Sequence, residues 1–175
     1  KKAREAAKLM VRTSPEIKLI AAGSSNYREN ADPDHWNQTI LHELRDVIDY
    51  IALHIYVGNP DSNYYNFVST PLVLEQRTKI VKGMIEREMQ KAVRPNKDPI
   101  YIAWDEYNVW YRARRGAAAR GKNALEERYN LEDALVIAGF LNAFIRNADI
   151  VKMANMAQLV NVIAPIFTSE KGMFR

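Results

Sequence analysis

Apolar and polar positions along this chain follow two alternating kinds of pattern. Short apolar runs, typical of buried parallel strands, occupy residues 17–23, 49–58, 100–104 and 149–160, the last of which includes the loop after its strand. Apolar residues recur with the spacing of a helix face at residues 1–12, 35–47, 70–93 and 130–148. Strands that alternate with helices predict a parallel sheet with right-handed crossover connections.

The predicted fold class is therefore α/β, and two architectures accommodate four strand–helix units. One is an open, doubly wound sheet, and the other is half of a (β/α)8 barrel, a fold whose complete form needs about 250 residues. No GxGxxG or GxxxxGKS/T motif follows any of the strand patterns, which argues against a nucleotide-binding open sheet. The chain starts inside a helical pattern without a capping residue, so we expect a fragment of a longer protein.

Composition and charge narrow the possible functions. The absence of cysteine excludes disulfides and thiolate metal sites, and no apolar run approaches the roughly 20 residues of a membrane-spanning helix. Much of the net charge of +4 comes from residues 1–12 and from the Arg-rich segment 112–122, which lacks interleaved aromatic residues. DPDH at residues 32–35 fits a turn and helix cap better than a metal site. We expect no metal, no cofactor, no nucleic-acid partner and no membrane contact.

Polar and aromatic residues gather where the predicted strands end. In both architectures this edge of the sheet carries the active site. Amides and carboxylates bind hydroxyl groups, aromatic faces pack against the C–H surface of a sugar, and no cationic cluster for phosphate is present. The set therefore suits a carbohydrate ligand. Its members are Ser24, Ser25, Asn26, His54, Tyr56, Gly58, Asn59, Asp105, Glu106, Asn108, Trp110, Asn155 and Gln158.

The same residues also fit structural roles. Asp105 and Glu106 are compatible with a solvated strand end, and His54 with a hydrogen-bonded histidine of the core. Tyr56 and Trp110 are compatible with ordinary core aromatics. Pattern alone leaves both sets of roles open.

Four segments, taken in order and spacing, closely resemble the α-L-arabinofuranosidases of glycoside hydrolase family 51. The resemblance covers nearly the whole chain, and the fourth segment is the most specific. It implies that residues 1–165 form the C-terminal half of a (β/α)8 catalytic barrel, approximately strands five to eight, a partial TIM barrel. Residues 166–175 would begin the linker to a β-sandwich domain. The segments are IKLIAAGSSN, IALHIYVGN, IYIAWDEYNVWYR and YNLEDALVIAGFLNAFIRNADIVKMANMAQLVNVIAPIFTS.

The resemblance also implies roles for individual residues. Glu106 matches the catalytic nucleophile, Tyr56 the tyrosine that donates a hydrogen bond to it, and Trp110 a wall of the substrate site. Gln158 matches a glutamine that contacts the bound sugar.

Two further substrate-binding residues are expected, and two departures from the family pattern stand out. His54 and Asn108 complete the expected substrate-binding set. Tyr107 stands where the family usually has Trp, which keeps an aromatic ring. The Asn–Glu pair that carries the acid/base, on strand four of the family barrel, has no match in this chain.

The resemblance thus implies a retaining hydrolase that removes terminal α-L-arabinofuranosyl residues from arabinan or arabinoxylan through a covalent glycosyl-enzyme. The isolated chain is expected to be inactive because the acid/base Glu is absent. The alternatives are another glycosidase of the same clan, such as an endoglucanase, and a non-catalytic sugar-binding half-barrel. We expect an arabinose-containing oligo- or polysaccharide as partner, a homo-oligomer and a cytoplasmic location. Strand alternation predicts that Glu106 faces the pocket and Asp105 faces away from it.

Overall fold

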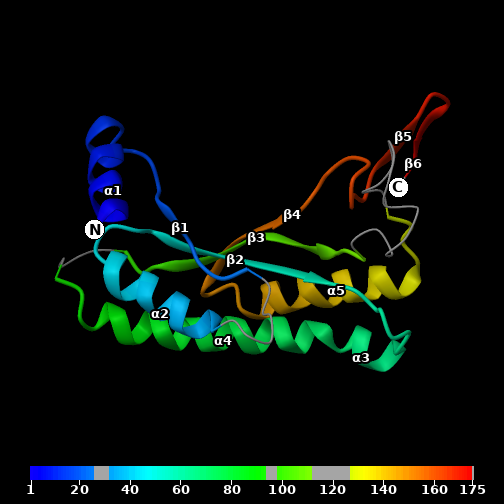
Figure 1. The fold of residues 1–175 in the computed structure, drawn as a ribbon, viewed down its shortest axis with the longest axis horizontal. Coiled ribbons are helices and arrows are strands. Elements are labelled where there is room, and N and C mark those ends of the chain that lie inside the picture. Colours follow the sequence, from blue (N-terminus) through cyan, green and yellow to red (C-terminus); the bar gives the residue numbers. More distant parts are fainter. Residues whose placement is uncertain (26–31, 94–97, 112–126, 175) are drawn as a thin grey trace.

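The computed structural model describes residues 1–25, 32–93, 98–111 and 127–174, and its centre is one four-stranded parallel sheet (Figure 1). The strands lie in the order β1 (Ile20–Ala22), β2 (Tyr50–Val57), β3 (Tyr101–Val109) and β4 (Val151–Met156). Each strand pairs in parallel with the next one along the chain. The predicted α/β class is confirmed. The third strand is longer than its apolar pattern, because it continues through both acids to Val109.

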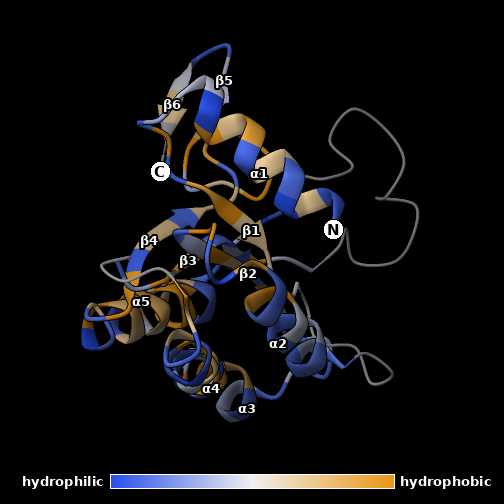
Figure 2. Ribbon diagram, turned by 90° about the vertical axis from the view of Figure 1, so that its left-hand side faces the viewer, coloured by the Kyte–Doolittle hydropathy of each residue, from blue (hydrophilic) through white to orange (hydrophobic). Residues whose placement is uncertain are grey.

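Helices connect successive strands and lie on one side of the sheet. They are α2 (Pro33–Leu44), α3 (Tyr64–Val68), α4 (Thr70–Met89) and α5 (Leu131–Arg146). Figures 1 and 2 show α1 (Lys2–Thr13) and the hairpin of β5 (Phe167–Ser169) and β6 (Gly172–Phe174) on the other side. The hairpin falls within the segment that we expected to begin a linker. The domain boundary at residue 165 stays a prediction.

Helix starts follow local capping chemistry. Asn130 caps α5 with a reciprocal capping box, in which its side chain accepts from the backbone N–H of Asp133 and the Asp133 carboxylate accepts from the Asn130 backbone N–H. The Asp32 side chain accepts a hydrogen bond of 2.9 Å from the backbone N–H of His35. DPDH is therefore a helix cap, as its spacing indicated.

The hydrophobic core fills the space between the sheet and α2, α4 and α5. Every second residue of the central part of β2 enters it, beginning at Ile51, and the intervening residues face the other side of the sheet. Core residues that are less than 3% exposed include Ile51, Leu53, Leu74, Val81, Ile85, Ile102, Trp104, Val109, Val136 and Phe140.

One exception to strand alternation lies in β3. Trp104 contacts the helix layer, because its ring lies 6.2 Å from that of Phe144 and its Nε1 donates to Thr78 Oγ1 at 3.1 Å. Tyr107, three residues later, also meets Phe144, with ring centroids 5.0 Å apart. Regular alternation would put residues three apart on opposite faces. The registers with β2 and β4 both shift here, as in a β-bulge.

The bulge decides where the two acids point. Since Trp104 and Tyr107 both face the helices, Asp105 and Glu106 between them both project from the opposite face. The expectation that Asp105 faces away from Glu106 is therefore wrong. Both carboxylates approach the same imidazole ring, that of His54.

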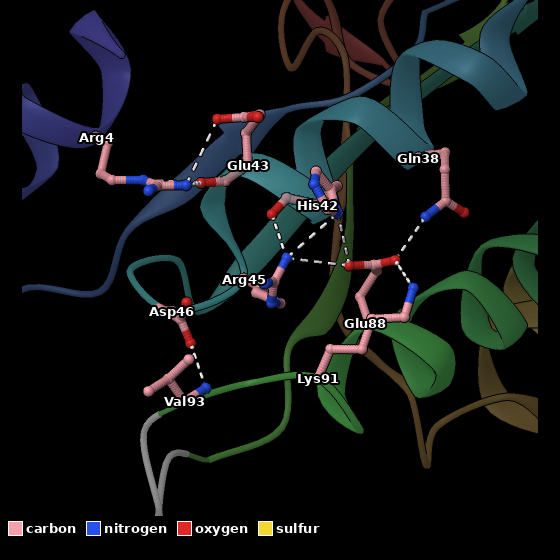
Figure 3. A network of polar contacts seen from close by, with 9 residues as sticks. All are labelled: Arg4, Gln38, His42, Glu43, Arg45, Asp46, Glu88, Lys91 and Val93. Atoms are coloured by element: carbon pink, nitrogen blue, oxygen red, sulfur yellow. Dashed lines mark hydrogen bonds and ion pairs between the residues drawn. The ribbon is translucent and has the colours of Figure 1, made fainter.

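A buried carboxylate joins α2 to α4 at the end of the sheet remote from these acids (Figure 3). The Glu88 side chain is 1% exposed, and its Oε1 accepts hydrogen bonds from Gln38 and Lys91 at 2.9 and 2.8 Å. Its Oε2 accepts from Arg45 at 3.2 Å and lies 3.3 Å from His42 Nδ1. Burial raises the pKa of Glu88, but Lys91 and His42 outweigh that effect and hold it below its ordinary value.

Candidate active site

The C-terminal ends of β2 and β3 bring His54, Tyr56, Asp105 and Glu106 together on the sheet face away from the helices. His54 and Tyr56 alternate along β2 with core residues, so both point to this face. In the register of the two strands His54 lies opposite Glu106. Pairing therefore places the histidine beside both acids.

The Glu106 carboxylate is the centre of the cluster. The Tyr56 hydroxyl donates a hydrogen bond to its Oε2 at 2.9 Å, and His54 Nδ1 lies 3.5 Å from the same oxygen. The Glu106 side chain is 45% exposed, so the carboxylate is also open to a ligand. A half-exposed carboxylate with a fixed donor suits nucleophilic or general-base chemistry.

The second carboxylate, Asp105, lies on the other edge of the His54 ring. Its Oδ1 is 3.0 Å from His54 Nε2. This oxygen is buried and has no hydrogen-bond partner of good geometry among the described residues, so its 3.0 Å approach to the ring nitrogen is close but not an aligned hydrogen bond. The sequence signal for this arrangement is the pair of large aromatics at positions 104 and 107, whose spacing breaks strand alternation.

Burial and charge shift the titration of two members of the cluster. Burial raises the pKa of the Tyr56 hydroxyl well above its ordinary value, and the hydrogen bond to Glu106 and its negative charge add to the rise. Tyr56 is therefore a neutral donor. Burial also raises the pKa of Asp105, with the Glu106 charge adding to it and His54 opposing it.

Trp110 closes one side of the cluster. Its ring meets that of Tyr56 edge-on, with centroids 5.3 Å apart and planes at 69°. Its backbone N–H donates to Val57 O at 2.7 Å, which extends the pairing of β2 and β3 beyond the strand end. The ring is thus held next to the hydroxyl that contacts Glu106, where it can form a wall for a ligand.

Asn108 serves the framework of this region. Its side chain is buried, and its Nδ2 donates to Ala157 O at 2.7 Å and to Ile163 O. Its Oδ1 accepts from the Val109 backbone N–H. This geometry assigns Asn108 a structural role, and its expected contact with substrate stays a prediction.

Gln158 follows β4 by two residues, and its side chain is exposed at the same edge of the sheet. The bond from Asn108 to Ala157 O fixes the backbone immediately before it. Ser24, by contrast, is engaged by α2, because its Oγ accepts from Asn37 at 2.9 Å. Asn26 and the Arg-rich segment 112–122 lie outside the described residues.

A separate cavity of about 1050 Å³ lies between the end of β3, α5 and the segment that leads into β5. Its lining is mainly apolar, and Glu106, Tyr56 and His54 are not among its described lining residues. No three His, Asp or Glu side chains gather as metal ligands within the described ranges. No helix of the described chain is long and apolar enough to cross a membrane.

Comparison with known proteins identifies the family. Residues 105–175 match the model of the α-L-arabinofuranosidase C-terminal domain. The intracellular exo-α-(1→5)-L-arabinofuranosidase of Halalkalibacterium halodurans is 36% identical over 97% of the chain. The intracellular exo-α-(1→5)-L-arabinofuranosidase 1 of Bacillus subtilis is 38% identical, also over 97% of the chain. The chain belongs to glycoside hydrolase family 51.

Solved structures agree with this assignment. The α-L-arabinofuranosidase of Thermotoga maritima in its arabinose complex has a TM-score of 0.78 and 36% identity, and the match covers 98% of this chain and 32% of that one. The family 51 α-L-arabinofuranosidase of Thermotoga petrophila has a TM-score of 0.78 and 37% identity, and the match covers 99% of this chain and 32% of that one. The chain spans about a third of the length of its curated relatives: it covers 34% of the Halalkalibacterium halodurans enzyme and 34% of the Bacillus subtilis enzyme.

Proposed function

We propose that this chain is the C-terminal half of the (β/α)8 catalytic barrel of a retaining α-L-arabinofuranosidase, with Glu106 as its nucleophile. The observation that carries the proposal is the 2.9 Å hydrogen bond from Tyr56 to Glu106 at the carboxyl end of adjacent parallel strands. In (β/α)8 enzymes, catalytic groups occupy this position. Family membership supplies the reaction type, and the site supplies a carboxylate with a fixed donor.

The one-sided helix layer supports the half-barrel. In a complete barrel, helices cover the outer face of the strands and side chains of the inner face meet across the axis. Here α2, α4 and α5 cover one face, and the polar cluster lies on the other. We assign residues 1–165 to the barrel and residues 166–175, which contain the β5–β6 hairpin, to the start of the following segment.

In the proposed reaction the Glu106 carboxylate attacks the anomeric carbon of a terminal α-L-arabinofuranosyl unit and forms a glycosyl-enzyme. Tyr56 orients the carboxylate by donating to the oxygen that it contacts. A second carboxyl group about 5–5.5 Å from the first must protonate the leaving oxygen and then activate water. It would come from a barrel strand that precedes this chain, so the isolated chain should be inactive.

The substrate class follows from the relatives. Their names describe intracellular exo-acting enzymes on (1→5)-linked arabinofuranosyl units, which supports an arabinose-containing oligo- or polysaccharide as substrate and a cytoplasmic location. Trp110 would pack against the sugar ring beside Tyr56, and the exposed Gln158 would contact its hydroxyl groups. Homo-oligomerisation stays a prediction.

The test is Glu106→Ala in the full-length protein, assayed on an aryl α-L-arabinofuranoside. Turnover should fall by at least about a thousandfold, because no covalent intermediate can form. Sodium azide should restore activity and give a glycosyl azide of inverted configuration. Glu43→Ala, at an exposed position on α2, serves as the matched control and should retain full activity.

Two outcomes would reject the proposal. One is an active Glu106→Ala variant, which would remove the nucleophile assignment. The other is a full-length protein that cleaves cellulose but not arabinofuranosides, which would replace the substrate class.

A further inference from the structure

We propose that Asp105 is a positioning residue for Glu106 and acts through His54. It holds the imidazole by Nε2, so that the ring presents Nδ1 to the nucleophilic carboxylate. The proposal rests on the assignment of Glu106 as nucleophile. It adds Asp105 to Tyr56 and His54 as a residue that helps to hold the Glu106 carboxylate.

The β3 bulge creates this arrangement. Without it, the two acids would face opposite sides of the sheet, and only one of them could meet the histidine. With it, the ring of His54 lies between two carboxylates, 3.0 Å from Asp105 Oδ1 and 3.5 Å from Glu106 Oε2. Tyr56 contacts the same Glu106 oxygen from its own position two residues further along β2.

The hydrogen-bonding chemistry of the imidazole ring indicates which of its nitrogens carry hydrogen. An ionised carboxylate can only accept hydrogen bonds, and a ring nitrogen without hydrogen would turn its lone pair toward an anionic oxygen. Both contacts of His54 are therefore favourable together only when both ring nitrogens carry hydrogen. The buried Asp105 oxygen, which has no aligned hydrogen bond, gains a cation at 3.0 Å in this form.

A two-donor His54 has a definite effect on the proposed reaction. During glycosylation, Glu106 loses its negative charge as it bonds to the anomeric carbon. During deglycosylation that bond breaks, and the electron pair returns to the Glu106 carboxylate while water adds to the sugar. A cation beside Glu106 stabilises the departing carboxylate, so it assists the second step more than the first.

The first experiment observes the ring directly in the full-length protein, labelled with ¹⁵N-histidine and assigned with His54→Gln. We expect both His54 nitrogens to be protonated at pH 7 in the unsubstituted protein and only one in Asp105→Asn. A neutral His54 ring in the unsubstituted protein would overturn the proposal. This measurement needs no catalytic activity, so it stands whether or not Glu106 is the nucleophile.

The second experiment measures turnover of an aryl arabinofuranoside. Asp105→Asn should lower kcat about tenfold, the factor for one lost charge-assisted contact. KM should fall with it, because slower deglycosylation lets the glycosyl-enzyme accumulate, and a burst of phenol should appear. In a His54→Gln background the same substitution should change kcat by less than about twofold.

The matched control is Asp149→Asn, which removes one carboxylate charge from the pair with Lys82 at the start of β4 without approaching His54. It should leave kcat, KM and the ring spectrum unchanged. Equal losses from Asp105→Asn in the presence and absence of His54 would overturn the link between them. Loss of the azide rescue of Glu106→Ala would instead reject the proposed function, with the ring spectrum still deciding the His54–Asp105 contact.

Discussion

The sharpest stability prediction concerns Glu88, the buried carboxylate between α2 and α4. Glu88→Gln keeps the length of the side chain and removes its charge. Donors approach both carboxylate oxygens, Gln38 and Lys91 on one side and Arg45 on the other. An amide has one acceptor oxygen and one donor nitrogen, so in either orientation its NH2 group meets a donor.

The size of the destabilisation follows from how well each hydrogen-bond partner of Glu88 is shielded from solvent. The Arg45 side chain is 17% exposed, and loss of a hydrogen bond to such a charged group costs about 1.5–3 kcal/mol. Lys91 is 59% exposed, so its contact contributes only about 0.5 kcal/mol. A neutral amide is also easier to bury, which offsets part of the loss. We expect about 2 kcal/mol of destabilisation, or roughly 4–8 °C in melting temperature at this chain length.

The pH dependence gives a second signature. The pKa of Glu88 is lower in the folded chain than in the unfolded one, so its contribution is present above the unfolded pKa and is lost as pH falls through the folded pKa. The difference in stability between the unsubstituted chain and the Glu88→Gln variant should therefore shrink under acid conditions.

Guanidinium unfolding followed by circular dichroism, at neutral and acid pH, measures both effects. Glu43→Gln is the control, because the Arg4–Glu43 contact joins side chains that are 44% and 52% exposed and should contribute less than about 0.5 kcal/mol. Equal destabilisation by the two substitutions, or a Glu88→Gln difference that is the same at both pH values, would refute the reasoning.

Two further predictions concern the site and the helix layer. Tyr56→Phe in the full-length protein should lower kcat by roughly ten- to a hundredfold, through loss of one hydrogen bond to a charged group, and an unchanged kcat would separate Tyr56 from the nucleophile. Gly139→Ala should destabilise the chain, because the new methyl group would collide with the Pro71 ring, whereas Gly83→Ala, with open space around it, should stabilise it by about 0.5–1 kcal/mol. Thermal unfolding of both variants checks this pair, and equal shifts would contradict it.

Hydrophobic periodicity was sufficient to predict the four strands of the sheet and the long helices, but it predicted neither the short helix α3 nor the β5–β6 hairpin. The helix that begins after Asn130 and the helix with Pro71 in its first turn both lie where the apolar spacing indicated. Boundaries were less accurate where the pattern ended on polar residues. The 100–104 run does not indicate that β3 extends to Val109, since Asp105, Glu106 and Asn108 interrupt its apolar residues.

The arrangement of the site was only partly predictable. Proximity of Tyr56 and Glu106 follows from two parallel strands that end at the same edge of a sheet. The orientation of Asp105 does not, because alternation assumes a regular strand and a bulge shifts every later residue to the other face. The role of Asn108 was equally hidden, since its partners Ala157 and Ile163 lie about fifty residues away in the chain.

The two ends of the sheet hold buried carboxylates in different ways: Glu88 at one end is stabilised by its surroundings, and Asp105 at the end that carries the candidate active site is not. At the end that carries Glu88, the buried carboxylate has several donors and a lowered pKa. At the active end, the buried Asp105 oxygen has no aligned hydrogen bond among the described residues, and burial raises the pKa of its carboxyl group. Since the pKa of Asp105 is raised even with His54 beside it, folding disfavours its ionised form, so its neutralisation should leave the melting temperature unchanged or higher. A variant that loses turnover while it keeps or gains stability is what a positioning role for Asp105 requires, and a residue of purely structural function would do the opposite.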